Sequence, residues 1–183
     1  TRQTDAYEGA AMIRIADIHD IDQIAEIYEH ILDAEEAGEA VVGWKRNVYP
    51  TYQTALKGVS KGDMFVEENG KTIVAAGRIN QEQVDEYANC PWLYQASEHE
   101  VMVLHTLVVD PQIRGKGYGS EFVRFYEAYA ISHRCHCLRM DTQEKNKAAR
   151  TFYERLGFRE AGIVLCNFNG IPDVRLVCLE KKI

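Results

Sequence analysis

The sequence lacks three features that would each place it in a broad class of proteins. It has no apolar run near the roughly 20 residues of a membrane-spanning helix, and its polar first residues lack the apolar centre of a signal peptide. Basic side chains are in the minority, with 21 Lys and Arg against 28 Asp and Glu and a formal net charge of −7. Because phosphate backbones need a basic footprint, we expect neither a membrane nor a nucleic acid as a partner.

A disulfide framework and a metal site are also missing from the pattern. Five cysteines are an odd number without regular spacing, which favours reduced thiols and a cytoplasmic protein. The His-Arg-Cys-His-Cys run at residues 133–137 is too tight for a usual zinc spacing, so no metal is expected. A chain of 183 residues that is 46% hydrophobic can bury a core. We therefore predict a tail over residues 1–11 and a single domain over residues 12–183.

What the chain does contain is a distinctive stretch at residues 104–120. A β-branched apolar run ends at Asp-Pro, three alternate glycines follow with Arg114 and Lys116 among them, and a helical pattern begins at Tyr118. Glycines let the backbone approach a ligand and the first N–H groups of a helix are unpaired, so this order predicts a phosphate site. The spacing matches neither the P-loop nor the dinucleotide fingerprint. A glycine-rich turn that only joins a strand to a helix is the alternative.

Local patterns predict strands and helices along the rest of the chain. Asn69-Gly70 between two strand-like runs is a strong hairpin signal, and Asp20-x-x-Gln23 predicts a capping box at a helix start. A strand, a helix and a strand in succession imply a parallel pair. The predicted strands cover residues 12–15, 64–68, 71–79, 101–109, 137–142, 162–168 and 174–179, and the predicted helices begin near residues 21, 52, 118 and 146.

A second motif lies downstream of the glycines. It reads Asn146-x-x-Ala149-x-x-Phe152-Tyr153-x-x-x-Gly157-Phe158 and follows Gln112-x-x-Gly115-x-Gly117 with one helix and one strand between. The two motifs resemble the pyrophosphate loop and the second sequence block of the GNAT superfamily of acetyl-CoA-dependent N-acetyltransferases. The order of elements matches from about residue 12 to the end. The resemblance implies an α/β (α+β) GNAT fold: a mixed, mostly antiparallel seven-stranded sheet with helices on both faces, whose parallel central pair, 101–109 and 137–142, splays apart.

The resemblance also implies acetyl-CoA as co-substrate and no metal. The backbone of Leu107 and Val109 would bond the pantetheine amides, and the N–H groups of residues 114–120 would cradle the pyrophosphate. Asn146 matches a side chain that bonds the pantetheine, and a helix N-cap is its other reading. The residues assigned to the co-substrate are Leu107, Val108, Val109, Arg114, Gly115, Lys116, Gly117, Tyr118, Gly119, Ser120, Asn146, Ala149 and Phe152.

The reaction implied by the resemblance is direct acetyl transfer to a primary amine, without a covalent enzyme intermediate. It needs a base, an oxyanion donor and an acid. Tyr153 matches the tyrosine that protonates the CoA thiolate in similar proteins, and a core tyrosine with a satisfied hydroxyl is the alternative. The oxyanion donor would be a backbone N–H of the bulged central strand, at Val108 or a neighbour.

Two residues are candidates for the base. His105 interrupts an apolar strand, histidine titrates near neutral pH, and a histidine near this position resembles the arylalkylamine members of the family. Glu100 is second, because carboxylates early on this strand serve as bases in protein-acetylating members. A histidine bonded within the sheet and a solvated strand start are the respective alternatives. On a regular strand the two side chains lie on opposite faces, so both cannot serve.

The sequence leaves the acceptor open. Residues 81–100 form a long connection with acidic and aromatic side chains and no Lys or Arg, which suits an amine cation or, equally, a solvated loop with an aromatic plug. Trp44 and Tyr49 predict either a packed lid or a substrate wall. The acceptor is a small amine or a protein amine, and a homodimer stays open because dimers are common among similar proteins. A catalytically silent CoA-binding regulatory module is the alternative function.

Overall fold

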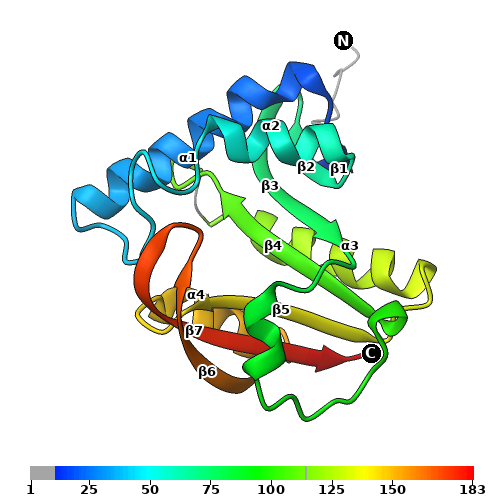
Figure 1. The fold of residues 1–183 in the computed structure, drawn as a ribbon. Helices are drawn as coiled ribbons and strands as arrows, with labels where there is room; N and C mark the ends of the chain where they lie inside the picture. Colours follow the sequence, from blue (N-terminus) through cyan, green and yellow to red (C-terminus); the bar gives the residue numbers. More distant parts are fainter. Residues whose placement is uncertain (1–10, 114) are drawn as a thin grey trace.

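The computed structural model describes residues 11–113 and 115–183, so nearly all of the predicted tail lies outside the described residues. Within them, a seven-stranded sheet carries helices on both faces (Figure 1). The strands are β1 (Met12–Ile15), β2 (Met64–Asn69), β3 (Thr72–Asn80), β4 (Val101–Val109), β5 (Cys137–Gln143), β6 (Arg159–Phe168) and β7 (Ile171–Lys182). The helices are η1 (Ile18–Asp20), α1 (Ile21–Glu36), α2 (Tyr52–Lys61), η2 (Asp85–Asn89), η3 (Glu98–Glu100), α3 (Tyr118–Ser132) and α4 (Lys147–Arg155), of which η1, η2 and η3 are short 3-10 helices.

The sheet confirms the predicted fold class. Its strand order is β1-β2-β3-β4-β5-β7-β6, and neighbouring strands are antiparallel except β4 and β5, which are parallel. The parallel pair follows from the order of the chain, because α3 crosses over between the two strands. The hairpin predicted at Asn69-Gly70 is the turn between β2 and β3, where Gly70 adopts a φ of 65°.

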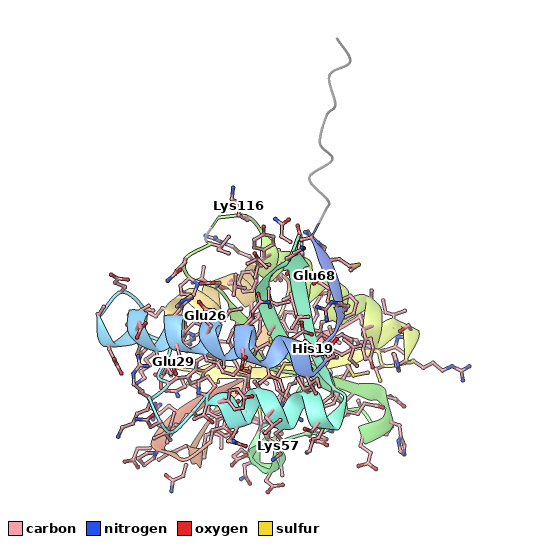
Figure 2. The ribbon with its side chains drawn as sticks, turned by 90° about the horizontal axis from the view of Figure 1, so that it is seen from above. His19, Glu26, Glu29, Lys57, Glu68 and Lys116 are labelled. Carbon is pink, nitrogen blue, oxygen red and sulfur yellow. The ribbon has the colours of Figure 1, made fainter. Side chains whose placement is uncertain are left out.

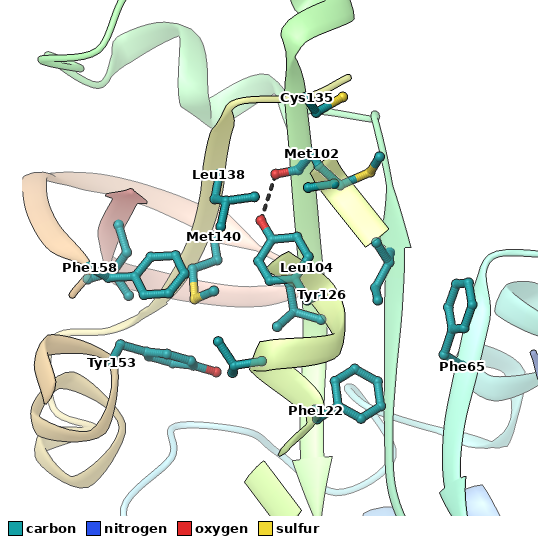
Figure 3. Close-up of a cluster of buried hydrophobic side chains, with 14 of the residues drawn as sticks. Phe65, Met102, Leu104, Phe122, Tyr126, Cys135, Leu138, Met140, Tyr153 and Phe158 are labelled. Atoms are coloured by element: carbon teal, nitrogen blue, oxygen red, sulfur yellow. Dashed lines mark hydrogen bonds between the residues drawn. The ribbon is translucent and has the colours of Figure 1, made fainter. Parts of the chain in front are cut away.

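Two layers of helices cover the two faces of the sheet. α1 and α2 pack on one face, where Ile24 and Ile27 of α1 recur at helical spacing in one buried cluster. α3 and α4 pack on the other face, around Phe122 and Tyr126 (Figures 1 and 3). Charged side chains such as Glu29 stay on the outer surface of α1 (Figure 2). Each helix therefore buries one apolar stripe and leaves its charged stripe in water.

The predicted capping box at the start of α1 is wrong. Asp17, three residues earlier, forms the capping box of η1, and the Asp20 side chain makes no cap bond to α1. The Asp20 carboxylate instead receives two hydrogen bonds from Arg14, at 2.7 and 2.9 Å. Gln23 Oε1 accepts the backbone N–H of Ile73 at 3.0 Å. Both oxygens of Asp20 are thus occupied by Arg14 and by the Asp17 N–H, so the carboxylate does not cap α1.

β4 and β5 pair over a short distance only. Their register ends at Val103↔Arg139, and beyond these residues the two strands separate in a fork. Tyr126 of α3 is fully buried at this fork, and its hydroxyl lies 2.6 Å from the carbonyl oxygen of Met102 and 3.1 Å from that of Arg139 (Figure 3). A buried carbonyl without a donor costs free energy. Tyr126 therefore stabilises the point at which the parallel ladder ends.

A β-bulge interrupts β4 beyond the fork. Arg78 of β3 faces His105 and Ala76 faces Val108, so β4 advances three residues while β3 advances two. Thr106, inside the bulge, has a φ of 53°, which is rare for a β-branched residue. The strain of this conformation is held by the pairs on either side of it.

The bulge also shifts the alternation of side chains along β4. Leu104 and Leu107 both pack with the α3 cluster, although residues three apart lie on opposite faces of a regular strand. Val108 packs on the other face, with α1. The last residues of β4 therefore enter the splayed region with side chains in both layers.

The long connection at residues 81–100 packs against the sheet. The Glu180 carboxylate of β7 is fully buried and accepts the backbone N–H groups of Leu93 and Tyr94 at 3.0 and 2.9 Å. The Arg139 guanidinium lies 4.3 Å over the Trp92 ring, a cation–π contact. Carboxylate, guanidinium and aromatic ring together hold this segment against β5 and β7.

Tyr126→Phe tests the fork. The variant keeps the buried ring but leaves the two carbonyls without the hydroxyl donor, so the free energy of unfolding should fall by about 1–3 kcal/mol. Urea denaturation followed by circular dichroism measures the loss. Tyr129→Phe on the same helix is the control, because the Tyr129 ring stacks on its neighbours and its hydroxyl makes no hydrogen bond to the described residues. Equal losses in both variants would contradict the role given to the Tyr126 hydroxyl.

Candidate functional site

A cavity of about 930 Å³ opens where β4 and β5 separate. Its walls come from β4, β5, α4, the connection between α1 and α2, and the turn between β6 and β7. One strand and one helix supply most of the predicted site residues in it. Those that line the cavity are His105, Leu107, Val108, Val109, Asn146, Ala149, Phe152 and Tyr153.

Other predicted site residues lie elsewhere. Glu100 is the last residue of η3, is exposed, and precedes the end of β4 that is remote from the cavity. Residues 115–120 form the turn into α3 and its first residues, and they do not line the cavity. Arg114 lies outside the described residues. The structure thus brings His105 and Tyr153 to one cavity but not Glu100.

The turn into α3 offers open backbone. Gly115 and Gly117 have φ values of 76° and 79°, and an added Cβ at either would meet nothing within 4 Å. Gly117 is the N-cap of α3 and supplies no side-chain acceptor to the first N–H groups, those of residues 118–120. Lys116 beside it extends outward (Figure 2). An uncapped helix start with a cation beside it has the chemistry that phosphate oxygens require.

Two residues at the start of α3 have packing roles. A Cβ at Gly119 would meet Phe152 Cζ at 3.1 Å, so the glycine lets α3 and α4 approach each other closely. Tyr118 is buried, and its hydroxyl accepts a hydrogen bond from Asn69 Nδ2 at 2.9 Å. The Tyr118 side chain therefore anchors the turn to the β2–β3 hairpin.

α4 carries two polar residues of the second motif. Asn146 is the N-cap, and its Oδ1 accepts the N–H of Ala149 at 3.1 Å. Tyr153 is 8% exposed, projects from α4 (Figure 3), and its hydroxyl makes no hydrogen bond to the described residues. Burial, and then the charge of Asp141, raise the pKa of Tyr153 above its usual value. The hydroxyl therefore stays protonated at neutral pH and can give a proton to a group in the cavity.

His105 lies in a polar network between β3 and β4. Asn80 donates through Nδ2 to the Asp63 carboxylate at 2.8 Å and accepts the Glu82 N–H on Oδ1 at 3.0 Å, so its amide orientation is fixed. His105 Nε2 lies 2.7 Å from the same Oδ1 and must be the donor. Burial, and then the charge of Arg78, lower the pKa of His105 to about 4. The ring is therefore neutral at pH 7, with its lone pair on Nδ1.

Aromatic side chains of the α1–α2 connection wall the cavity. Trp44 and Tyr49 both line it, with their rings edge to face and centroids 6.0 Å apart. The Tyr49 hydroxyl is hydrogen-bonded to Thr106 Oγ1, which ties this wall to the bulge of β4. Trp92, by contrast, does not line the cavity and packs on Arg139.

Among the cavity residues that sequence reasoning missed is Asp141 of β5. Its Oδ2 accepts a hydrogen bond of 2.6 Å from the Tyr87 hydroxyl, and burial raises its pKa to about 6. The signal that could have found it is a carboxylate near the end of a largely apolar strand. Only the fold shows that this end of the strand faces a cavity.

Neither a membrane span nor a metal cluster is found in the part of the chain that the structure describes. No helix there is long and apolar enough to cross a bilayer. No group of three or more His, Cys, Asp or Glu side chains there could hold a metal ion. The five cysteines are free thiols, and burial raises the pKa of Cys135 and Cys137 within the run at 133–137.

Comparisons with known proteins identify related chains. A family model described as the acetyltransferase (GNAT) family matches residues 21–158. An uncharacterized N-acetyltransferase of Methanocaldococcus jannaschii is 33% identical over 76 residues, which are 42% of this chain and 34% of that protein. Streptothricin acetyltransferase of Escherichia coli is 32% identical over 97 residues, which are 52% of each chain. These alignments thus span only part of the length of either relative.

Solved structures share the fold along nearly the whole chain. An acetyltransferase of the GNAT family from Streptococcus agalactiae is 23% identical with a TM-score of 0.78, and the match covers 97% of this chain and 98% of that chain. The protein yncA from Salmonella typhimurium, solved with its cofactor acetyl-CoA, is 17% identical with a TM-score of 0.65, covering 95% and 94%. At these identities the likeness establishes the fold.

The protonation state of His105 can be measured directly. Nitrogen-15 spectra of the imidazole rings, with His105→Gln to assign the signal, should show the neutral Nε2–H form from pH 8 down to about pH 4. The physical reasons are burial and the fixed acceptor on Asn80. An imidazolium signal at pH 6.5, or a proton on Nδ1, would contradict the network described above.

Proposed function

The chain belongs to the acetyltransferase (GNAT) family, and from this premise we propose that it transfers the acetyl group of acetyl-CoA directly to a primary amine. The observation that carries the proposal is the cavity beyond the fork. It joins the edge of β4 left unpaired by β5 to the polar residues of α4. The cavity can therefore hold a ligand that pairs with the free edge of β4 close to a proton donor on α4.

Acetyl-CoA supplies an activated acetyl thioester when bound. The backbone of Leu107 and Val109 would hydrogen-bond the pantetheine amides, because β4 has no strand partner on its β5 side at these residues. The N–H groups at the start of α3 would bind the pyrophosphate, with Arg114 and Lys116 adding charge. Asn146, Ala149 and Phe152 would line the arm, and the open, uncapped helix start supports this assignment.

In the proposed reaction, Tyr153 gives its proton to the leaving sulfur. A phenol that stays protonated in a buried cavity suits the acid, and its free hydroxyl supports the role. A backbone N–H at the bulge, Val108 or a neighbour, would bind the developing oxyanion. Of the two sequence candidates for the base, His105 is the one that lines the cavity, and its ring is neutral. Glu100 would need intervening groups to reach a proton there.

The shape of the cavity favours a small amine over a protein segment. Trp44, Tyr49 and Phe168 wall it from two separate parts of the chain. One relative is named for its action on streptothricin, which accords with a small acceptor. A CoA-binding module without catalysis is the rival function, and it would bind CoA without any turnover.

Tyr153→Phe tests the acetyl-transfer proposal. Thiol release from acetyl-CoA with a panel of primary amines should show kcat reduced by about 10²–10⁴-fold, because the leaving sulfur loses its proton donor. CoA affinity by calorimetry should change little. Tyr52→Phe, at an exposed tyrosine outside the cavity, is the control and should keep full activity. If CoA binds but no amine gives Tyr153-dependent turnover, the silent module is the correct reading.

His105→Ala tests the base separately. A histidine with a pKa of about 4 becomes protonated only near pH 4. If it is the base, its protonation should lower kcat/KM of the wild type only at and below this pH. If His105 is the base, the variant should be slower at every pH and should lack that acidic limb. A pH–rate profile that keeps the same limb would remove His105 as the base while leaving acetyl transfer intact.

A further inference from the structure

Three carboxylates line the cavity, and they differ in their partners. Glu82 pairs with Lys61 at 3.7 Å, and Asp110 lies 3.1 Å from His30 Nδ1. Asp141 has no cationic partner among the described residues. Its Oδ2 is held by the Tyr87 hydroxyl, whereas its Oδ1 has no hydrogen-bond partner there. Asp141 thus lines the cavity with one carboxylate oxygen that has neither a hydrogen-bond partner nor a counter-ion among the described residues.

The groups that interact with Asp141 are phenols, thiols and one acid. β5 is flanked by β7 and covered by η2 and α4, and none of these elements brings a cation to it. Burial disfavours the charged carboxylate, and the neighbouring acid of η2 adds to the effect. A bound cation would supply the missing partner. The titratable groups that face Asp141 are Tyr49, Glu86, Tyr87, Tyr153, Cys166 and Cys178.

Asp141 also lies at the right depth in the cavity. It is two residues beyond Arg139, the last residue of β5 that pairs with β4, and so at the start of the splayed region. Its charge acts on the hydroxyls of Tyr153 and Tyr49. A group held by Oδ1 is therefore near both the proposed acid and the aromatic wall.

We propose that Asp141 binds the ammonium group of the acceptor and takes its proton, and that the acceptor is a primary alkylamine with an apolar substituent. The inference rests on the proposed acetyl transfer. Trp44, Tyr49 and Phe168 offer aromatic faces to the cation and apolar surface to its substituent. Asp141 then takes the place of His105 as the base, and His105 stays a neutral ring that donates through Nε2 to Asn80 Oδ1.

The atoms of this step balance. One N–H bond of the ammonium breaks, an O–H bond forms at Asp141 Oδ1, and the electron pair stays on nitrogen. That pair forms the C–N bond to the acetyl carbon as the C–S bond breaks, and the Tyr153 proton goes to sulfur. The second N–H bond of the nitrogen then breaks, and its proton passes through water to the Tyr153 phenolate, which leaves a neutral amide. Asp141 releases its proton to bulk water, so both side chains return to their starting states.

Tyr87 is a positioning residue in this arrangement. Its hydroxyl holds Oδ2 and leaves Oδ1 without a hydrogen-bond partner among the described residues. The same hydrogen bond lowers the pKa of Asp141 against the effect of burial. In Tyr87→Phe the acidic limb of the pH–rate profile should therefore move to higher pH, which a purely structural loss would not produce.

The experiment measures kcat/KM from pH 5 to pH 9 for two amines with acetyl-CoA. Benzylamine is an ammonium ion at neutral pH, and aniline is neutral. In wild type, kcat/KM for benzylamine should fall below about pH 6, where Asp141 is protonated. Asp141→Asn should lower it by about 100-fold or more at pH 7 and remove this limb, while aniline loses no more than a few-fold. Methylamine should be a poorer substrate than benzylamine.

Asp85→Asn is the matched control, because it removes an exposed carboxylate of η2 that does not line the cavity. It should behave as wild type with both amines. CoA affinity by calorimetry shows that each variant is folded, and Tyr87→Phe supplies an independent readout should Asp141→Asn not fold.

Two outcomes separate the hypotheses. If Asp141→Asn keeps the benzylamine rate and its acidic limb, the inference about Asp141 is wrong and acetyl transfer stands. If wild type binds CoA but acetylates none of the three amines, both the inference and the proposed transfer to simple primary amines are wrong. An equal loss for benzylamine and aniline would also overturn the ammonium role.

Discussion

The site depends on a parallel ladder that stops early. A β-sheet normally satisfies its backbone groups by pairing, and strands that part inside a core leave carbonyls without donors. Tyr126 supplies a hydroxyl at the fork, to the carbonyls of Met102 and Arg139, so the separation is tolerated in the fold. The cavity lies directly beyond it. Tyr126, from the helix that connects the two strands, thereby stabilises the separation on which the cavity depends.

Charge around the cavity is controlled by fixed neighbours. Asp63 is neutralised by Arg78, with two hydrogen bonds of 2.8 Å, and through Asn80 it orients the ring of His105. Among the described residues, Asp141 in contrast has a phenol for a neighbour and no cation. An acid behind the cavity and an acid that lines it thus behave differently. The charge of Asp63 is already compensated by Arg78, whereas the Asp141 carboxylate remains available to bind a cation.

Local patterns predicted what depends on local sequence. The bounds of β4, the hairpin at Asn69-Gly70 and the glycine turn all follow from residues next to one another. The cap at Asp20 was mispredicted because Arg14 reaches it from a neighbouring strand. Asp141 was missed for a similar reason, since its hydrogen bond comes from a distant segment of the chain. The lowered pKa of His105 likewise depends on burial and then on the charge of Arg78 in β3, and no pattern within β4 contains either.

The bulge at Thr106 serves the cavity and not the pairing of the sheet. Because it inserts one residue, the strand on either side keeps its phase: Leu104 and Leu107 remain on one face, as residues two apart would in a regular strand. A chain without Thr106 would therefore satisfy the sheet at least as well and would discard a strained conformation. It would also lose the hydroxyl that holds Tyr49 against β4. Thr106 is therefore not needed for the pairing of the sheet, but it is needed to hold the aromatic wall of the cavity in place.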